Sequence, residues 1–133
     1  KDNPVFYVQY AHARISSLKR KAAVAGVDIA GPADLDLLGG EELALVRLAA
    51  QYPRTLEGAA ATHEPHRIAF YLYDLAAAFH APWHRGNDDP VRRFLVENNP
   101  QLSRARLELA LGIGQIIRSG LALMGVAATE EMR

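Results

Sequence analysis

Between residues 65 and 83, apolar side chains recur at the spacing of an α-helix. They follow one another at intervals of four, three and four positions, as Ile68, Leu72, Leu75 and Phe79. This spacing places them on one face of a helix with 3.6 residues per turn. No segment of the chain alternates apolar and polar residues between turn signals, as a half-buried β-strand would. The sequence therefore predicts an all-α fold.

Proline and glycine residues mark where the helices of this fold begin and end. Asn3-Pro4 is typical of a helix start and Gly26 of a helix end, so the first helix is predicted from Pro4 to about residue 25. Further helices are predicted over residues 41–52, 53–61, 65–83 and 101–124. Between them we expect a loop over 26–40, a polar turn over 85–90, and one or two helical turns over 91–97. Because the connections are short, the prediction is a single domain, residues 1–133, built as a bundle of four or five helices.

The charges of the chain balance overall but are unevenly distributed. Lys and Arg number 15, as do Asp and Glu, so the formal net charge is zero. Such balance is not typical of a protein that binds nucleic acid by bulk charge, because that affinity comes largely from phosphate contacts. Residues 1–21 nevertheless carry a net charge of +4, and residues 28–64 one of −5. One basic face is therefore available to an anionic partner.

The chain has no cysteine, and no apolar run reaches the roughly 18 residues that a membrane span needs. These two features lead us to expect a protein of the cytoplasm with no membrane partner. Because the first residue is Lys1 and not methionine, we also expect the 133 residues to be a piece of a longer protein.

One stripe of the first predicted helix combines aromatic and cationic side chains. It follows steps of three, four, three and four residues through Tyr7, Tyr10, Arg14, Ser17 and Lys21. Such a stripe suits unpaired nucleotides, because tyrosine rings stack on bases and arginine or lysine contacts phosphate. The alternative is that the tyrosines lie at the edge of the core with their hydroxyls in water. For Trp83 the same two interpretations are open: its ring is either a core side chain or an exposed stacking surface.

The histidines and the Gly112-Ile113-Gly114 segment do not form a recognisable active site. His80 and His84 are four residues apart, but no cysteine and no third ligand accompanies them or the pair His63 and His66. We therefore expect no metal site and predict solvated or helix-terminal histidines. The glycine segment lacks the third glycine of a dinucleotide-binding turn and lies inside a helical pattern, so close helix packing explains it better. No catalytic residue is predicted.

Three segments together are similar to a known family. Residues 3–18, NPVFYVQYAHARISSL, resemble the opening helix of the anticodon-binding domain of arginyl-tRNA synthetases, with its Tyr-x-Gln-Tyr-Ala-His-Ala-Arg core here running from Tyr7 to Arg14. Residues 64–83 resemble the family's second signature, in which a Tyr-Leu-Tyr run leads to Phe-His and an aromatic pair. Residues 106–132 resemble its closing helix and methionine-ended tail. The resemblance covers the chain from end to end.

This resemblance implies the C-terminal, DALR-type anticodon-binding domain of a class I synthetase, an enzyme that joins arginine to its tRNA with ATP. The catalytic domain, which binds ATP and Mg²⁺, would lie outside residues 1–133, so no catalytic residue and no cofactor is expected in this chain. The partners would be tRNA(Arg) and the protein's own catalytic domain, in a cytoplasmic monomer. Two alternatives come from other classes. One is a helical protein–protein interaction bundle without RNA binding, and the other is a small metal-dependent hydrolase that uses the histidines.

The resemblance also assigns anticodon binding to five residues, Tyr7, Tyr10, Arg14, Trp83 and Met132. The chain departs from the family pattern in two places. Pro82-Trp83 stands where many members have Phe-Tyr, which keeps a stacking surface and loses a tyrosine hydroxyl. Arg133 follows the methionine with which many members end, which affects any contact made by a terminal carboxylate.

Overall fold

The computed structural model describes residues 3–132 and folds them into an all-α bundle. Five α-helices follow one another as α1 (Pro4–Val24), α2 (Gly40–Ala49), α3 (Tyr52–Thr62), α4 (His66–Asp88) and α5 (Pro100–Leu123). Two short 3₁₀ helices, η1 (Leu35–Leu37) and η2 (Pro90–Arg92), lie in the connections, and residues 3–132 contain no strand. The predicted fold class is confirmed. Lys1, Asp2 and Arg133 lie outside the described residues.

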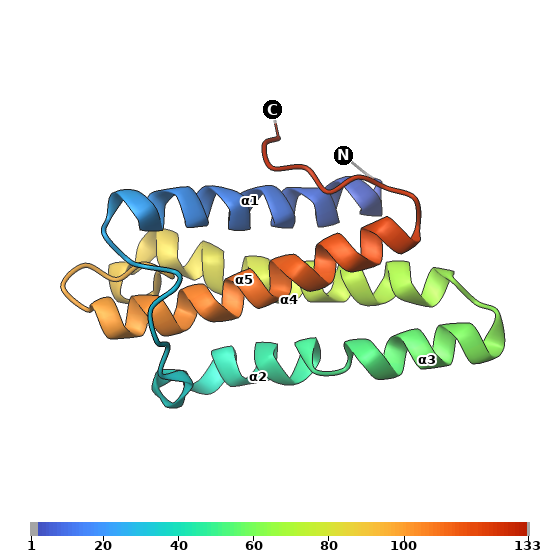
Figure 1. Cartoon of the computed structure of the whole chain (residues 1–133), viewed down its shortest axis with the longest axis horizontal. Helices are drawn as coiled ribbons and strands as arrows, with labels where there is room; N and C mark the ends of the chain where they lie inside the picture. Colours follow the sequence, from blue (N-terminus) through green and yellow to red (C-terminus); the bar gives the residue numbers. More distant parts are fainter. Residues whose placement is uncertain (1–2, 133) are drawn as a thin grey trace.

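The helices form layers that are visible in Figure 1. α4 and α5 make the middle layer, and α1 packs against both of them on one side. On the other side, α2 and α3 follow each other almost in line, with α2 against α4 and α5 and α3 against α4. Within residues 3–132, no helix is both long and apolar enough to cross a membrane.

The core lies where α4 and α5 face each other and α1. Its largest fully buried apolar side chains are Leu72, Leu75, Phe79, Leu107, Ile113, Ile117 and Leu121. Burying a side chain of this size stabilises the fold by about 1.5–3 kcal/mol relative to leaving it exposed. The four apolar residues that carried the helix prediction for 65–83 are all buried, so the face predicted from their spacing is the core face of α4.

The helix ends follow from local hydrogen bonds. The Asn3 side chain accepts a hydrogen bond from Val5 N at 2.9 Å, and Pro4 occupies the first turn of α1. The Glu42 carboxylate accepts from the Gly39 backbone N–H at 2.9 Å, which caps α2. These bonds satisfy amide groups that have no partner inside the helix. Gly26 follows α1 with a φ of +81°, a left-handed conformation that glycine adopts without strain, as predicted for a helix end.

Glycine also lets α5 approach its neighbours closely. A methyl group on Gly114 would lie 3.1 Å from Ile15 Cγ2 of α1, and one on Gly120 would lie 2.7 Å from Leu72 Cδ1 of α4. The interpretation of Gly114 as a close-packing residue is therefore confirmed. Gly112, its neighbour in the Gly-x-Gly segment, faces open space instead.

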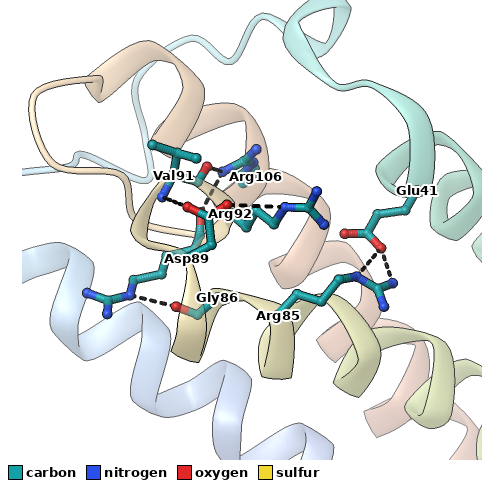
Figure 2. A network of polar contacts seen from close by, with 8 residues as sticks. Glu41, Arg85, Gly86, Asp89, Val91, Arg92 and Arg106 are labelled. Carbon is teal, nitrogen blue, oxygen red and sulfur yellow. Dashed lines mark hydrogen bonds and ion pairs between the residues drawn. The ribbon is translucent and has the colours of Figure 1, made fainter.

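The end of α4 differs from the prediction. The helix continues through the buried Pro82 to Asp88, so the polar turn predicted over 85–90 is wrong for most of its length. Two tertiary contacts hold these last turns: Arg85 forms an ion pair with Glu41 of α2, and the Gly86 carbonyl accepts a hydrogen bond from Arg93 Nε at 2.8 Å (Figure 2). After it, the segment 91–97 contributes to helix only through the short η2.

The C-terminal tail, residues 126–132, turns back from α5 and lies along α1 (Figure 1). Gln9 Nε2 donates a hydrogen bond to the Ala127 carbonyl at 2.9 Å, and His12 Nδ1 donates one to the Thr129 carbonyl at 2.7 Å. His12 is buried beneath this contact. Helix α1 therefore meets α4 on one side and the tail on another.

Candidate nucleic-acid interface

Four of the five predicted site residues meet where α1 packs on α4. Tyr7, Tyr10 and Arg14 come from successive turns of α1, and Trp83 comes from α4. The guanidinium carbon of Arg14 lies 5.0 Å from the ring centroid of Tyr10 and 5.2 Å from that of Trp83. Distances of this size are those of cation–π contacts. With His80, which contacts Tyr7, Tyr10 and Arg14, we define these residues as the aromatic–arginine cluster.

His80 lies at the centre of the aromatic–arginine cluster and is only 4% exposed. Its ring centroid is 4.9 Å from that of Tyr7 and 6.1 Å from that of Tyr10. Arg14 Nη1 lies 2.9 Å from His80 Nδ1. Because a guanidinium group only donates hydrogen bonds, Nδ1 accepts and the proton of the neutral ring sits on Nε2. Burial and the positive charge of Arg14 lower the pKa of His80 to about 4. His80 is therefore an uncharged acceptor at neutral pH, and it holds Arg14 between the rings of Tyr10 and Trp83.

The members of the cluster differ in exposure. Tyr10 is 45% exposed, whereas Tyr7, Arg14 and Trp83 are half-buried. The Trp83 ring also rests on two core rings, with centroid distances of 5.9 Å to Phe79 and 6.0 Å to Phe94. Trp83 thus combines the two roles that its sequence position left open, because part of it packs on the core and part stays at the surface.

Tyr7 partly matches the alternative interpretation of the α1 stripe, in which the tyrosines lie at the edge of the core. It packs at the edge of the core, with its ring centroid 4.9 Å from that of Tyr73. Burial and the neighbouring Tyr73 raise the pKa of Tyr7. The more exposed Tyr10 and the guanidinium of Arg14 are the groups of the cluster with the most freedom to meet a ligand.

Sequence reasoning missed His80 and Tyr73 as members of this surface. A signal was present, because Tyr73, His80 and Trp83 follow one another at seven and three residues, the spacing of one helix face. The prediction that the histidines are solvated or helix-terminal is wrong for the buried His80. It is confirmed for His63, which ends α3 in the left-handed region, and for the exposed His66 and His84.

Met132, the fifth predicted residue, belongs to the tail. The Thr129 hydroxyl donates to Met132 Sδ at 3.2 Å, while the Thr129 carbonyl is held by His12 of α1. No hydrogen bond within residues 3–132 joins Met132 to the aromatic–arginine cluster. Arg133, whose position after the methionine departs from the family pattern, lies outside the described residues.

The charges separate into a basic and an acidic side of the bundle. Lys19, Arg20 and Lys21 are exposed on the C-terminal half of α1. The acidic segment 28–64 contains α2 and α3, which pack on the opposite side of the middle layer. An uneven field of this kind orients an anionic ligand toward α1 even though the net charge is zero.

The histidines do not assemble a metal site in the part of the chain that the structure describes. No three His, Cys, Asp or Glu side chains gather there as ligands would. His80 and His84, the pair with ligand-like spacing, have ring centroids 6.1 Å apart, and Nδ1 of His80 already accepts from Arg14. The groups of this surface are suited to binding a base and a phosphate rather than to metal-assisted hydrolysis.

Comparison with known proteins shows what this chain resembles. Residues 8–132 match a family model described as the DALR anticodon binding domain. An arginine–tRNA ligase of Novosphingobium aromaticivorans is 61% identical over 132 residues, which cover 99% of this chain and 22% of that protein. An arginine–tRNA ligase of Ruegeria pomeroyi is 54% identical over 138 residues, covering 100% and 24%. The solved arginyl-tRNA synthetase of Thermus thermophilus superposes with a TM-score of 0.74 at 32% identity, over 95% of this chain and 21% of that one. The chain thus spans less than a quarter of these relatives.

Proposed function

Because the chain belongs to the DALR anticodon-binding domain family, we propose that it binds the anticodon stem-loop of an arginine tRNA through the aromatic–arginine cluster. The observation that carries the proposal is the position of Arg14 between the rings of Tyr10 and Trp83, on a surface that is partly open. An anticodon loop presents unstacked bases and phosphates, which aromatic faces and a guanidinium group can bind together.

Each residue of the proposed site has a distinct task. Tyr10 and Trp83 offer ring faces for stacking, and Arg14 contacts a phosphate or a base edge. Tyr7 supports His80, which keeps Arg14 in place. The tail forms a second wall of the interface, because His12 ties it to α1 through Thr129. Met132, which accepts a hydrogen bond from Thr129, contacts the RNA from this wall.

The activity of the whole protein is part of the same proposal. The relatives are named as arginine–tRNA ligases, and this chain corresponds to 22–24% of their length, which supports a catalytic domain elsewhere in the same polypeptide. ATP and Mg²⁺ would act in that domain. The partners would then be arginine tRNA and the catalytic domain, in a monomer located in the cytoplasm.

The proposal is tested on the full-length ligase with the substitutions Trp83→Ala and Tyr10→Ala. Loss of one stacking face is expected to weaken tRNA binding by about 1–3 kcal/mol, or roughly 5- to 150-fold in Kd, and to lower kcat/KM for arginylation in proportion. Binding of ATP and arginine should persist, because both would bind elsewhere. Trp83→Phe keeps an aromatic face and is expected to recover most of the loss.

Phe70→Ala provides the matched control. Phe70 is an aromatic residue of α4 that is 66% exposed, and its ring lies against His66, with 5.6 Å between the ring centroids, rather than against the aromatic–arginine cluster. This substitution should leave tRNA binding unchanged. Equal binding by the wild-type, Trp83→Ala and Tyr10→Ala proteins would refute the assignment of the cluster, and a stable complex with another protein in place of tRNA would favour the interaction-bundle alternative.

A further inference from the structure

A pocket continues the surface of the aromatic–arginine cluster along α1. It has a volume of about 350 Å³ and lies between the C-terminal half of α1 and the segments that follow Trp83. Lys21, Asn87 and Arg93 are its exposed polar residues, Phe94 and Leu95 are apolar and at least half-buried, and Trp83 belongs to both the pocket and the cluster. A volume at the lower end of the range of small-ligand sites suits a group of the size of one nucleotide.

The position of Arg93 in this pocket is determined by a close backbone approach. A methyl group on Gly86 would lie 3.1 Å from Arg93 Cα, so a larger residue here would push the segment after η2 slightly away from α4. The Gly86 carbonyl, drawn in Figure 2, accepts a hydrogen bond from Arg93 Nε at 2.8 Å. This bond uses one edge of the guanidinium group, and the two terminal nitrogens keep their capacity to donate.

The two cations of the pocket differ from their neighbours, because neither has an acidic partner among residues 3–132. Arg85 pairs with Glu41 and Arg92 with Asp89, as Figure 2 shows. Within residues 3–132, neither Lys21 nor Arg93 forms an ion pair with a carboxylate. Two cations beside a half-buried aromatic ring are therefore available to an anion that also carries an apolar face.

The spacing along α1 connects the pocket to the proposed RNA site. Lys21 and Arg14 lie on one stripe, seven residues and therefore about 10 Å apart along the helix axis. Arg14 is held between the rings of Tyr10 and Trp83, whereas Lys21 lines the pocket further along the helix, so a strand that contacts Arg14 can meet Lys21 with its next unit. A polyanion with repeating phosphates and planar bases satisfies this geometry, because every unit brings both a charge and a ring, whereas the acidic side chains of a peptide carry no ring to stack on Trp83.

We infer that the pocket lined by Lys21, Trp83, Asn87 and Arg93 binds one nucleotide of the RNA next to those that the aromatic–arginine cluster binds. Its phosphate accepts hydrogen bonds from Lys21 and Arg93, and its base lies against Trp83. The inference rests on the proposed function and extends it, because it gives the interface a direction: the strand leaves the cluster toward the C-terminal end of α1.

The experiment measures the affinity of the full-length protein for an anticodon stem-loop of arginine tRNA over a range of salt concentrations. Lys21→Ala is expected to lower affinity roughly 3- to 10-fold at low salt and to reduce the slope of log K against log salt by about 0.7, the value of one phosphate contact on a single strand. Lys21→Glu should enlarge both effects. Arg47→Ala is the matched control, because Arg47 is an exposed cation of α2, on the acidic side of the bundle.

Two further comparisons separate this inference from the proposed function. Tyr10→Ala should lower affinity without changing the salt slope, since it removes stacking and no charge. In a set of stem-loops, an uncharged methylphosphonate replaces a different phosphate in each. One of these replacements should weaken RNA binding by the wild-type protein but not by Lys21→Ala. If wild type binds the RNA and Lys21→Ala keeps its affinity and slope, the inference is wrong and the proposed function stands. If wild type does not bind the RNA, both are wrong.

Discussion

The buried His80 makes a specific prediction about stability and pH. In the folded chain its pKa is lowered to about 4, whereas a histidine in the unfolded chain titrates near 6.5. Protonation would place a charge in a site that is 4% exposed and would require Nδ1 to give up the hydrogen bond from Arg14. Folding therefore favours the neutral ring.

The sign and size of the effect follow from this difference in pKa. Above pH 6.5 the ring is neutral in both states, and His80 adds no pH dependence. Between pH 6.5 and 4 the unfolded chain binds a proton that the folded chain does not, so the free energy of unfolding falls as pH falls. A difference of about 2.5 pKa units at 1.36 kcal/mol each corresponds to a loss of about 3 kcal/mol by pH 4.

The assay is urea unfolding of the chain at pH 7, 6, 5 and 4, followed by the fluorescence of Trp83, the single tryptophan. His80→Gln keeps an acceptor for Arg14 but does not titrate, so it should lose about 3 kcal/mol less than wild type between pH 7 and pH 4. His66→Gln, an exposed change at the start of the same helix, should keep the wild-type dependence. A His80 ring that titrates near pH 6.5 in the NMR spectrum of the folded chain would refute the reasoning.

Three other substitutions test the packing and the tail. Gly120→Ala would bring a methyl group to 2.7 Å from Leu72 Cδ1, so thermal or urea unfolding should show a loss of about 1–3 kcal/mol. Gly112→Ala, in the same helix but facing open space, should instead stabilise by about 0.5–1 kcal/mol, and a loss there would contradict this explanation. His12→Ala removes the hydrogen bond to the Thr129 carbonyl, so hydrogen exchange of the tail should rise roughly tenfold while that of α4 is unchanged.

The bundle could be predicted from the sequence except where tertiary contacts override a local rule. Proline normally ends a helix because it lacks an N–H group and crowds the preceding turn. α4 nevertheless continues past Pro82, because Arg85 binds Glu41 of α2 and Gly86 accepts from Arg93. Glu41 lies 44 positions before Arg85, and Arg93 lies beyond the end of the helix, seven positions after Gly86, so the helical pattern of α4 contains neither partner.

The α1 half of the candidate site was predictable, because its members lie at helical spacing in a recognisable core sequence. The α4 half was only partly so, since Trp83 could be assigned but His80 could not. His80 holds Arg14 in place only because Tyr7 covers its ring and Arg14, a residue 66 positions away, approaches it. Burial of this kind is a property of the packed helices, and a histidine in a sequence shows neither its exposure nor its pKa.

The bond between Gln9 and Ala127 joins residues that are 118 positions apart. A ribosome that adds roughly 5–20 residues per second needs about 6–24 s to make that interval of chain. For most of this time α1 is complete while the tail that lies along it has not been made. The aromatic–arginine cluster needs only α1 and α4, whereas the wall that the tail adds to the proposed RNA surface can form only once the last part of the chain has been made.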